Sequence, residues 1–541
     1  MKKILITLIS LGLLGIIYGI YILGPFRAFL PNMIFDSGTY LVLFQNNYEL
    51  RSTGGFISAY GVLETNFGIP SINFYDVYGE IDDHEYTNPP YYPMEELLGG
   101  PMYGGYTFRD SNWFADFEDS AAEIIKMYTL TNPDAQISGI LTVDFSTLED
   151  LVGLYEPVAA GEFELTKNNL FETLEAEVSD INRHSEEALS TRKDIMKDVI
   201  ENLIKKAIFH PFKQNDLFDL LAENFATKHA ILWFADLSLE KKVKNLGWSA
   251  TMPETTGDLL AVSESNLGGM KNDRYMARNI KYEVDIQDDE ILCTLEITMD
   301  HFGGVNIPLS GDYKGYLRAY VPATATLISS STETKTENYG TYQSFGDIVK
   351  LEDTAQTTLT YRYSLPISLV SDGTYDLNLI KQPGTDADHY EIIVHTEQGS
   401  ALESEDFETR EEHAYLSLDL EKDTQVSLKI NPDENSPRIH SHEIVELNKI
   451  YIGFNEPLDC GTAADSFGYS IVDTDKTVSG QTDTVSIVSI TCTGGDVWLD
   501  TAGMTSQDEE FYDVILRNIR DKHRNYLDPN PRTVTVVQRG L

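Results

Sequence analysis

Three arginines in polar turns of an acidic chain could bind phosphate. The sequence holds 40 lysines and arginines against 86 aspartates and glutamates, so each cation in a turn is notable. A guanidinium forks onto two phosphate oxygens and neutralises the charge that develops in phosphoryl transfer. We therefore predict one anion site at Arg51, Arg109 and Arg192, with Asn47 and Asp110 as further ligand-binding candidates. The sequence leaves the catalytic residues unidentified.

These residues also have an ordinary structural interpretation. Arg51 can pair with Glu49 or another carboxylate, as cations commonly do in so acidic a protein. Arg109-Asp110 can hold a loop in place. Gly54-Gly55 more often marks a tight turn with positive φ than a phosphate cradle, and the chain has no G-x-x-x-x-G-K-[ST] motif.

Composition defines an acidic, folded protein. The formal net charge is −46 and hydrophobic residues make up 42% of the chain. Nucleic-acid binding draws its affinity from a basic face, so we exclude nucleic acids as partners. The apolar content suffices for packed cores. At about 150 residues per domain, the length predicts three or four structural units.

Metal and nucleophile motifs are missing from the sequence. No G-x-S-x-G elbow and no H-E-x-x-H helix occurs. His440-Ser441-His442 supplies only two imidazoles, so we predict no metal site there. Cys293, Cys460 and Cys492 lack the C-x-x-C spacing of a zinc site. A bridge between Cys460 and Cys492 is chemically allowed outside the cytosol, and burial as small hydrophobic residues is the alternative.

An uncharged run near the N-terminus predicts a membrane anchor. Ile4 to Leu23 are 20 residues long, enough for a helix to cross about 30 Å of hydrocarbon. The run is longer than a typical signal-peptide core and no small-residue cleavage pattern follows it. Lys2 and Lys3 precede it, so the positive-inside rule keeps the N-terminus cytoplasmic. We predict a single-pass membrane protein with residues 1–27 as the anchor and its bulk extracytoplasmic.

The pattern over residues 28–270 predicts an α/β domain that would hold the arginines. Apolar strands are expected at Tyr40 to Phe44, Phe56 to Leu63, Ile69 to Val77 and His229 to Phe234. Capping boxes predict helices that open at Ser120 and Ser146. A three-to-four spacing of apolar residues predicts a longer helix from Thr191 to Ile208. Aromatic residues between Phe74 and Phe117 either line a groove for sugars or lipid, or fix a long loop by burial.

Several motifs of this domain resemble a family catalogued as domain of unknown function 4012. They are Asn46-Asn47-Tyr48-Glu49-Leu50-Arg51-Ser52-Thr53-Gly54-Gly55-Phe56, Arg109-Asp110-Ser111-Asn112-Trp113, Ala230-Ile231-Leu232-Trp233-Phe234-Ala235, Ser265-Asn266-Leu267-Gly268-Gly269 and Lys381-Gln382-Pro383-Gly384-Thr385. The resemblance spans about Tyr40 to Pro383. The family name implies no function.

The order of strands, turns and helices is also remotely similar to the LytR-CpsA-Psr phosphotransferases. That family is membrane-anchored and transfers glycopolymers from polyprenyl-pyrophosphate carriers with magnesium, and Arg51 and Arg192 match its arginines. Gly54-Gly55-Phe56 stands where that family has an aspartate taken as the metal ligand, and Asp76-Val77 stands in place of its Arg-Asp pair. The resemblance implies Mg²⁺ as a cofactor, but this replacement leaves both the cofactor and catalysis open.

The C-terminal half changes to the two-residue period of half-buried strands. Ile280 to Ile286, Leu292 to Met299, Gly315 to Val321, Thr358 to Tyr363 and Tyr390 to Val394 predict an antiparallel sandwich over residues 271–436. Ile450 to Asp459 and Tyr512 to Asp521 resemble the SbsA-type bacterial Ig-like domain, which implies a spacer or surface-presentation module over residues 437–541.

The sequence therefore predicts a membrane-anchored cell-envelope protein. The expected fold is an α/β domain with a LytR-CpsA-Psr-like mixed sheet, followed by all-β sandwich and Ig-like domains. The expected function is recognition, with transfer left open, of a phosphate-bearing or polyprenyl-pyrophosphate-linked glycan. The alternative is a non-catalytic structural or adhesive surface protein.

Overall fold

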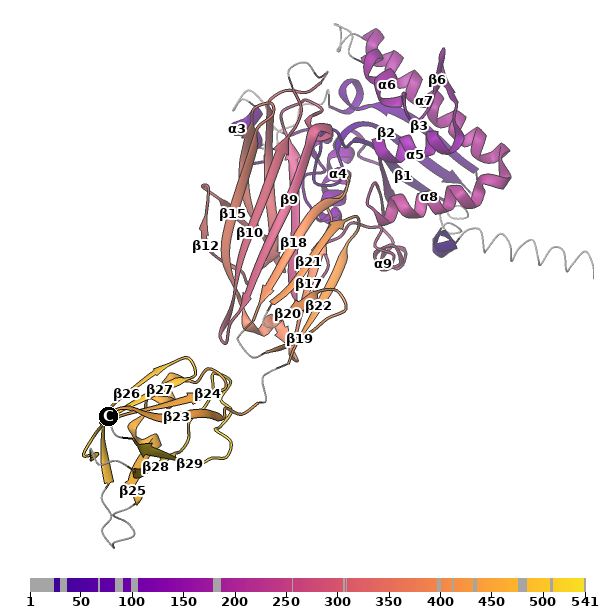
Figure 1. The fold of residues 1–541 in the computed structure, drawn as a ribbon. Coiled ribbons are helices and arrows are strands. Elements are labelled where there is room, and N and C mark those ends of the chain that lie inside the picture. Colours follow the sequence, from indigo (N-terminus) through magenta and orange to yellow (C-terminus); the bar gives the residue numbers. More distant parts are fainter. Residues whose placement is uncertain are drawn as a thin grey trace, which may run out of the picture. The chain divides into compact units, whose positions relative to one another are not determined.

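The computed structural model describes residues 24–29, 37–66, 69–82, 91–98, 106–178, 186–254, 256–304, 307, 309–396, 400–410, 413–431, 435–474, 484–505 and 509–539. The chain divides into two compact units. The first consists of Met1–Thr396, Ser404–Thr409 and His413–Leu428, and the second of Glu397–Glu403, Arg410–Glu412 and Lys429–Leu541. The first unit holds an α/β domain and a two-sheet β-domain, whereas the second is almost entirely β-structure (Figure 1).

The predicted mixed sheet of the α/β domain is confirmed. Five strands lie in the order β3-β2-β1-β4-β7. Their bounds are β1 Gly38–Asn46, β2 Phe56–Asn66, β3 Ile69–Asp76, β4 Ile137–Asp144 and β7 Ala230–Phe234. Strands β1 and β4 are parallel, and β2 and β7 run in the opposite direction. Strand β3 is antiparallel to β2 and therefore runs in the same direction as β1. As a result β1, β3 and β4 all end at the same edge of the sheet.

Helices cover both faces of this sheet because residues alternate sides along each strand. Leu41 and Leu43 of β1 pack with α4, whereas Tyr40 packs with α8, α9 and η1 on the other face. The helices are η1 Gly24–Ala28, η2 Val77–Ile81, α3 Met94–Leu98, η4 Phe108–Asp110, α4 Phe117–Thr131, α5 Phe145–Tyr155, α6 Leu170–Val178, α7 Glu186–Phe209, η5 Pro211–Lys213, α8 Gln214–Ala226 and α9 Leu237–Asn245. A small hairpin of β5 Val158–Ala160 and β6 Phe163–Leu165 packs on α7.

The predicted helix starts at Ser120 and Ser146 are wrong by a few residues. Helix α4 begins at Phe117 with Asp116 as its N-cap, and α5 begins at Phe145 with Asp144 as its N-cap. An aspartate carboxylate caps orphan amides as well as a serine hydroxyl does, so the earlier residue took the cap. The Ser120 hydroxyl instead bonds to the backbone of Phe114.

The second domain of the first unit consists of two large sheets. One has the order β12-β15-β10-β9-β18-β21-β20 and the other contains β13-β14-β11-β8-β17-β22-β19, with β16 paired to β17. The strands are β8 Asp258–Asn266, β9 Met276–Ile286, β10 Glu290–His301, β11 Tyr313–Pro322, β12 Thr326–Ser330, β13 Lys335–Asn338, β14 Tyr342–Leu351, β15 Gln356–Pro366, β16 Val370–Ser371, β17 Thr374–Ile380, β18 Asp388–His395, β19 Ala401–Glu403, β20 Glu408–Arg410, β21 His413–Leu420 and β22 Thr424–Asn431, with helical turns η6 Asn272–Tyr275 and η7 Ile367–Leu369.

This β-domain differs from the sequence prediction in two respects. It begins earlier than predicted, at Asp258, with strand β8. This strand is buried along its whole length, so its sequence lacks the alternation of apolar and polar residues that predicts a half-buried strand. It is also not purely antiparallel, since β17 pairs in parallel with β8 and β18 with β9.

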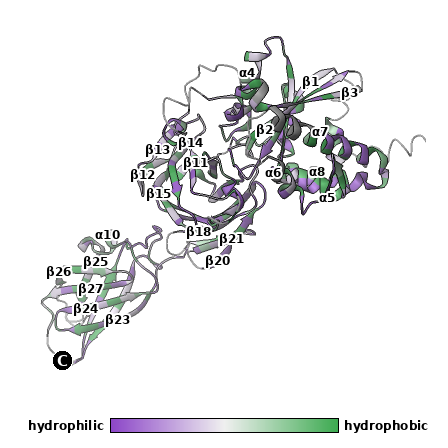
Figure 2. Ribbon diagram, turned by 90° about the horizontal axis from the view of Figure 1, so that it is seen from above, coloured by the Kyte–Doolittle hydropathy of each residue, from purple (hydrophilic) through white to green (hydrophobic). Residues whose placement is uncertain are grey.

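The second unit forms a nearly closed seven-stranded sheet. Its order is β23-β24-β27-β26-β25-β28-β29, and the end strands β23 and β29 contact each other. The elements are β23 Ile439–Glu446, β24 Lys449–Phe454, α10 Cys460–Ala463, η8 Ser466–Gly468, β25 Tyr469–Asp473, β26 Thr484–Thr493, β27 Asp496–Ala502, β28 Glu510–Leu516 and β29 Arg532–Gln538. Figure 2 shows hydrophobic and hydrophilic residues alternating along these strands, as expected for strands with one face in a core.

The predicted membrane anchor, Ile4 to Leu23, lies outside the described residues. Among the helices in the described ranges, none combines the length and apolar character that a membrane crossing requires. The anchor therefore stays a prediction.

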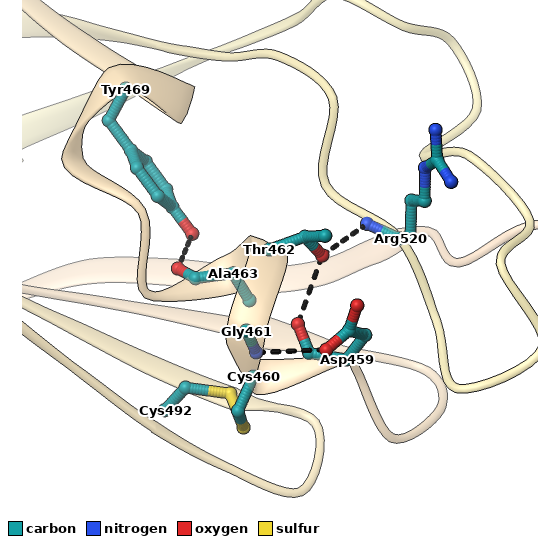
Figure 3. Close-up of a disulfide and its surroundings, with 8 residues drawn as sticks. All are labelled: Asp459, Cys460, Gly461, Thr462, Ala463, Tyr469, Cys492 and Arg520. Atoms are coloured by element: carbon teal, nitrogen blue, oxygen red, sulfur yellow. Dashed lines mark hydrogen bonds between the residues drawn. A yellow bond between two sulfur atoms is a disulfide. The ribbon is translucent and has the colours of Figure 1, made fainter.

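A disulfide between Cys460 and Cys492 resolves the alternative that the sequence left open (Figure 3). It ties the short helix α10 to strand β26, with the two Cα atoms 5.5 Å apart. Asp459 caps the same helix by accepting from the Gly461 amide, and the Thr462 hydroxyl accepts from the Arg520 amide. Cys293 is a free, buried thiol.

The bridge predicts a defined thiol count. The folded, unreduced chain should react with no maleimide, the denatured chain with one and the denatured, reduced chain with three, as read by intact mass. Replacing both Cys460 and Cys492 by serine should lower the stability of the second unit by about 3–4 kcal/mol in the chain-entropy picture. Three reactive thiols in the denatured, unreduced chain would contradict the bridge.

Candidate functional site

The turn that carries the first signature motif lies against the β-domain and not in an open groove. Arg51 follows β1 and is only 6% exposed. Its Nη1 donates to the carbonyls of Leu50 and Asn266, and its guanidinium lies 5.4 Å from the centre of the Phe56 ring. The Asn266 amide in turn donates to the Leu50 carbonyl over 2.9 Å. Arg51 therefore joins the α/β domain to strand β8, and its expected partner Glu49 pairs with Lys271 instead.

Gln382 is the centre of this junction. Its Nε2 donates to the carbonyls of Arg51 and Glu264 at 3.2 and 2.7 Å. Its Oε1 accepts from the Glu264 amide at 3.0 Å and from Arg278 Nη1 at 2.8 Å. One buried amide thus connects the signature turn of residues 47–55 with the signature loop of residues 381–385, about 330 positions later in the chain.

A buried ion network surrounds Gln382. Arg278 forms a bidentate pair with Asp388, at 3.0 and 2.5 Å, and lies 3.6 Å from Glu264. Tyr313 donates to Glu264 at 2.8 Å. Burial raises the pKa of Glu264, and the opposing charge of Arg278 counteracts that rise in part. The carboxylates of Glu264 and Asp388 therefore share Arg278 as their partner inside the junction.

Two lysines close the other side of the junction. Lys228 donates to the Lys381 carbonyl at 3.0 Å and to Asp423 at 2.5 Å. Lys381 donates to the carbonyls of Thr227 and Thr385. Burial lowers the pKa of Lys381 to about 8.

Two glycines make the closest backbone contact of the junction. Gly384 has φ of +78°, and a Cβ built on it would lie 2.0 Å from the Gly54 carbonyl oxygen. Gly54 also has positive φ, at +121°. The tight-turn interpretation of Gly54-Gly55 is therefore supported, with the added reason that a second backbone packs on it.

Arg318 is a junction residue that the sequence analysis missed. It is fully buried, and its Nη2 donates to the Ser52 hydroxyl and to the Trp113 carbonyl. Its guanidinium stacks 4.5 Å from the Trp113 ring. Strand β11 gives no sequence signal for this role beyond a charge at an inward position.

Tyr91, Tyr106 and Trp113 of the aromatic-rich stretch between Phe74 and Phe117 serve burial, whereas Phe74 lines the cleft described below and Tyr92 is 42% exposed. Tyr91 stacks on Tyr106 and on Trp113, and Trp113 stacks on Tyr316 of the β-domain. These rings belong to the core cluster that also contains Leu41 and Ile124. They fix the loop against both domains.

The second predicted arginine has different neighbours from Arg51. Arg109 lies 3.3 Å from Asp82 and 5.0 Å from the centre of the Tyr78 ring. Burial raises the pKa of Asp82 to about 6, although Arg109 counteracts this. Asp110 caps the turn by accepting from Thr107.

The remaining predicted ligand residues are placed as follows. Asn47 donates to Ser146 Oγ at 2.9 Å and to the Gly384 carbonyl at 3.1 Å. Arg192 lies in the first half of α7, where the side chains fall outside the described residues. The ligand role of Arg51, Arg109, Arg192, Asn47 and Asp110 stays a prediction, and the described ones among them bond to protein groups.

A separate apolar cleft opens where β1, β3 and β4 end together. It has a volume of about 80 Å³. Its walls come from the strand ends and from α5, α6 and α7, and they include Phe44, Phe74, Phe145, Leu148, Leu174, Ile195, Met196 and Ile200. Ala59 of β2 lies on its floor, and Asp76 and Asp144 are the acidic residues that line it. Ligands of α/β proteins typically bind at such carboxyl ends of strands.

The two aspartates of the cleft already serve the backbone. Asp76 accepts from the Tyr78 amide at 2.8 Å. Asp144 accepts from the Thr147 amide through one oxygen and lies 2.6 Å from His229 Nδ1 through the other. In the described ranges no three His, Cys, Asp or Glu side chains form a group that could hold a metal ion.

One comparison with known proteins matches part of the first domain to a family model. Residues 36–178 match the family described as "Protein of unknown function (DUF4012)", which confirms the resemblance to that family over this range. The search of curated proteins found no match. The similarity to LytR-CpsA-Psr proteins is not shown by these comparisons and stays a prediction.

The likenesses to solved structures are partial. The N-terminal part of the bacterial S-layer protein SbsC is 17% identical over 19% of this chain and 24% of its own, with a TM-score of 0.17. A putative nutrient-binding protein of Legionella pneumophila is 6% identical over 32% of this chain and 71% of its own, with a TM-score of 0.25. Lin1025 of Listeria innocua is 10% identical over 40% of this chain and 79% of its own, with a TM-score of 0.21. The chain spans about a quarter of the SbsC structure, and none of these scores establishes a shared overall fold.

The glycine contact gives a stability prediction. Gly384→Ala should destabilise the first unit by more than about 2 kcal/mol for two reasons. The new Cβ would clash with the Gly54 backbone, and alanine is strained at the positive φ of this position. Gly340→Ala is the matched control, since Gly340 has φ of +93° and nothing within 4 Å of its Cβ position. Urea unfolding should show a clearly larger loss for Gly384→Ala. Equal losses for the two variants would mean that the close approach is unimportant.

Asp82 gives a pH prediction. Burial holds its folded pKa at about 6, above the ordinary aspartate value of 3.8. Between these two values of pH the folded state binds more protons than the unfolded state. Its contribution to stability is full below pH 4 and is lost as pH rises through 6. Asp82→Asn should therefore flatten the decline in unfolding free energy between pH 4 and 6, by up to about 1.4 kcal/mol per pH unit.

The control for Asp82 is the exposed Asp134, replaced by asparagine. Guanidinium unfolding at three values of pH measures the slope of each variant. An Asp82→Asn slope equal to that of the wild type would show that Asp82 does not titrate in this window.

Proposed function

We propose that the α/β domain binds the hydrocarbon part of a polyprenyl-linked envelope glycan in the cleft at the ends of β1, β3 and β4. The observation that carries this proposal is an apolar cleft at the ligand-binding edge of a mixed α/β sheet. The cleft walls are aromatic and aliphatic, so an apolar chain gains free energy by leaving water there.

The size of the cleft limits what enters it. A group the size of one water molecule or methylene occupies about 10–15 Å³ of cavity volume. The cleft volume of about 80 Å³ therefore admits roughly five to eight such groups. This corresponds to one branched isoprene unit and not to a whole polyprenyl chain. The sugars and the rest of the lipid would lie outside the cleft.

The charge near the cleft constrains the phosphate. Asp76 and Asp144 would repel a phosphate placed beside them unless a divalent cation lies between. Two carboxylates that already accept backbone or histidine hydrogen bonds would hold Mg²⁺ weakly. The proposal is therefore recognition, with Mg²⁺ strengthening the binding of phosphorylated ligands, and transfer chemistry has no support from these residues.

A structural role in the envelope is the second candidate. It is favoured by the junction, where Arg51, Gln382 and Lys381 are used to hold two domains together. Both candidates share the proposed location, a single-pass membrane protein with its bulk extracytoplasmic. The Cys460–Cys492 bridge supports that location, because disulfides persist in oxidising compartments.

Photocrosslinking tests the cleft. The full chain in lipid vesicles is exposed to a diazirine-bearing polyprenyl phosphate, with and without Mg²⁺, and crosslinked peptides are mapped by mass spectrometry. Crosslinks are expected in the strand ends near Phe74 and in α7 near Ile200. Ala59→Leu should reduce them several-fold by filling the floor of the cleft.

Ala277→Leu, on an exposed position of β9, is the control and should leave the crosslinks unchanged. Unlabelled polyprenol should compete, because the cleft takes the hydrocarbon. Crosslinks that Ala59→Leu does not reduce, or that fall outside these segments, would refute the cleft and favour the structural role.

A further inference from the structure

The end of α7 and the following turn expose an unusual set of apolar side chains. Ile204, Ile208, Phe209 and Phe212 are 47%, 64%, 77% and 99% exposed. In contrast, Ile195, Val199 and Leu203 of the same helix are buried in the core with α5 and α6. At about 100° per residue, Ile204, Ile208 and Phe209 lie on the side of the helix away from Leu203. We call these four residues the α7 patch.

The segment that carries the α7 patch contains three lysines and no acidic residue. Lys205, Lys206 and Lys213 stand among its residues, and no acidic residue occurs between Glu201 and Asp216. This is notable in a chain of net charge −46. Lys205 pairs with Glu201 at 3.5 Å, and Lys213 donates to the Leu154 carbonyl at the end of α5. Exposed aromatic and aliphatic groups beside lysines are the composition of a surface that lies in a lipid headgroup layer.

The position of the patch supports the same conclusion. Figure 1 shows α7 and α8 meeting at one corner of the α/β domain, with the patch at the turn between them. Phe26 of η1 packs on Phe218 of α8, with ring centroids 5.4 Å apart, and Lys242 donates to the Ala28 carbonyl. Phe218 lies about 6 Å along α8 from its first residue, Gln214. The residues that directly follow the uncharged run Ile4 to Leu23 thus pack on α8, the helix that follows the patch in the chain.

We propose that the α7 patch is a membrane-contact surface that inserts Phe209 and Phe212 into the headgroup region of a bilayer with anionic lipids. The surface immediately precedes α8, the helix on which η1 packs. Its effect would be to hold the α/β domain in one orientation on the bilayer. The membrane-contact surface is separate from the proposed ligand cleft, and it does not depend on ligand binding there.

A single-cysteine label tests this surface in the full chain. Cys293 is buried and the other two cysteines are bridged, so an introduced cysteine can be labelled selectively with bimane. Phe212→Cys reports on the patch, and Ile328→Cys, at the 59% exposed Ile328 of β12, is the control. The labelled chains are reconstituted into vesicles of phosphatidylcholine with or without phosphatidylglycerol, and nitroxide-bearing lipids serve as quenchers.

The expected result is quenching at position 212 several-fold greater than at position 328, and greater with phosphatidylglycerol than without it. Adding Lys205→Glu and Lys206→Glu to Phe212→Cys should reduce the quenching in the anionic vesicles. Equal quenching at the two positions, or no association with vesicles, would overturn the proposal. A blue-shifted label at position 212 without lipid quenching would mean that protein, such as a second copy, covers the patch, and would overturn it too.

Discussion

The first unit depends on satisfying polar groups that are buried where its two domains meet. A buried guanidinium or ammonium is costly unless its donors are used, and a buried carboxylate is costly unless it is paired. At this junction Arg278 is paired with Asp388 and Gln382 uses both ends of its amide. Removing one member would leave its partners buried and unpaired, which costs several kcal/mol. The junction therefore holds one arrangement of the two domains.

This constraint changes the meaning of the signature residues. The sequence alone makes Arg51 a candidate phosphate ligand, favours a tight turn at Gly54-Gly55 and gives the loop of residues 381–385 no ligand role. In the fold they are the two halves of one contact, with Gly384 against Gly54 and Gln382 against the Arg51 carbonyl. Glycine is needed because two backbones approach closely, and arginine is needed because it reaches carbonyls across the junction. Domain packing thus accounts for these contacts, and the ligand role of Arg51 stays a prediction.

The cleft lies beside the junction, since Asn46 and Asp144 line it while the neighbouring Asn47 donates to the Gly384 carbonyl. The cleft and the α7 patch are both formed by α7, which contributes Ile195, Met196 and Ile200 to the cleft and Ile208 and Phe209 to the patch. A helix that touches the bilayer at one end and lines a lipid-binding cleft along its length would let a ligand pass from the membrane to the protein. The two proposals are independent, but one helix connects them.

The sequence by itself determined the kind of several long elements. The apolar run of Tyr40 to Phe44, the spacing of Ile195, Val199 and Leu203, and the alternation of Ile280 to Ile286 predicted a strand, a helix and a strand, because periodicity reports which side of an element is buried. It missed β8, whose two buried faces remove the alternation, and it misplaced two helix starts by a few residues because aspartates took the caps. Only the tertiary structure decided what Arg51, Arg318 and Gln382 contact, because their partners lie hundreds of residues away and no local pattern encodes such a pairing. The cleft likewise arises from three strand ends and three helices, so it exists only once the chain has folded.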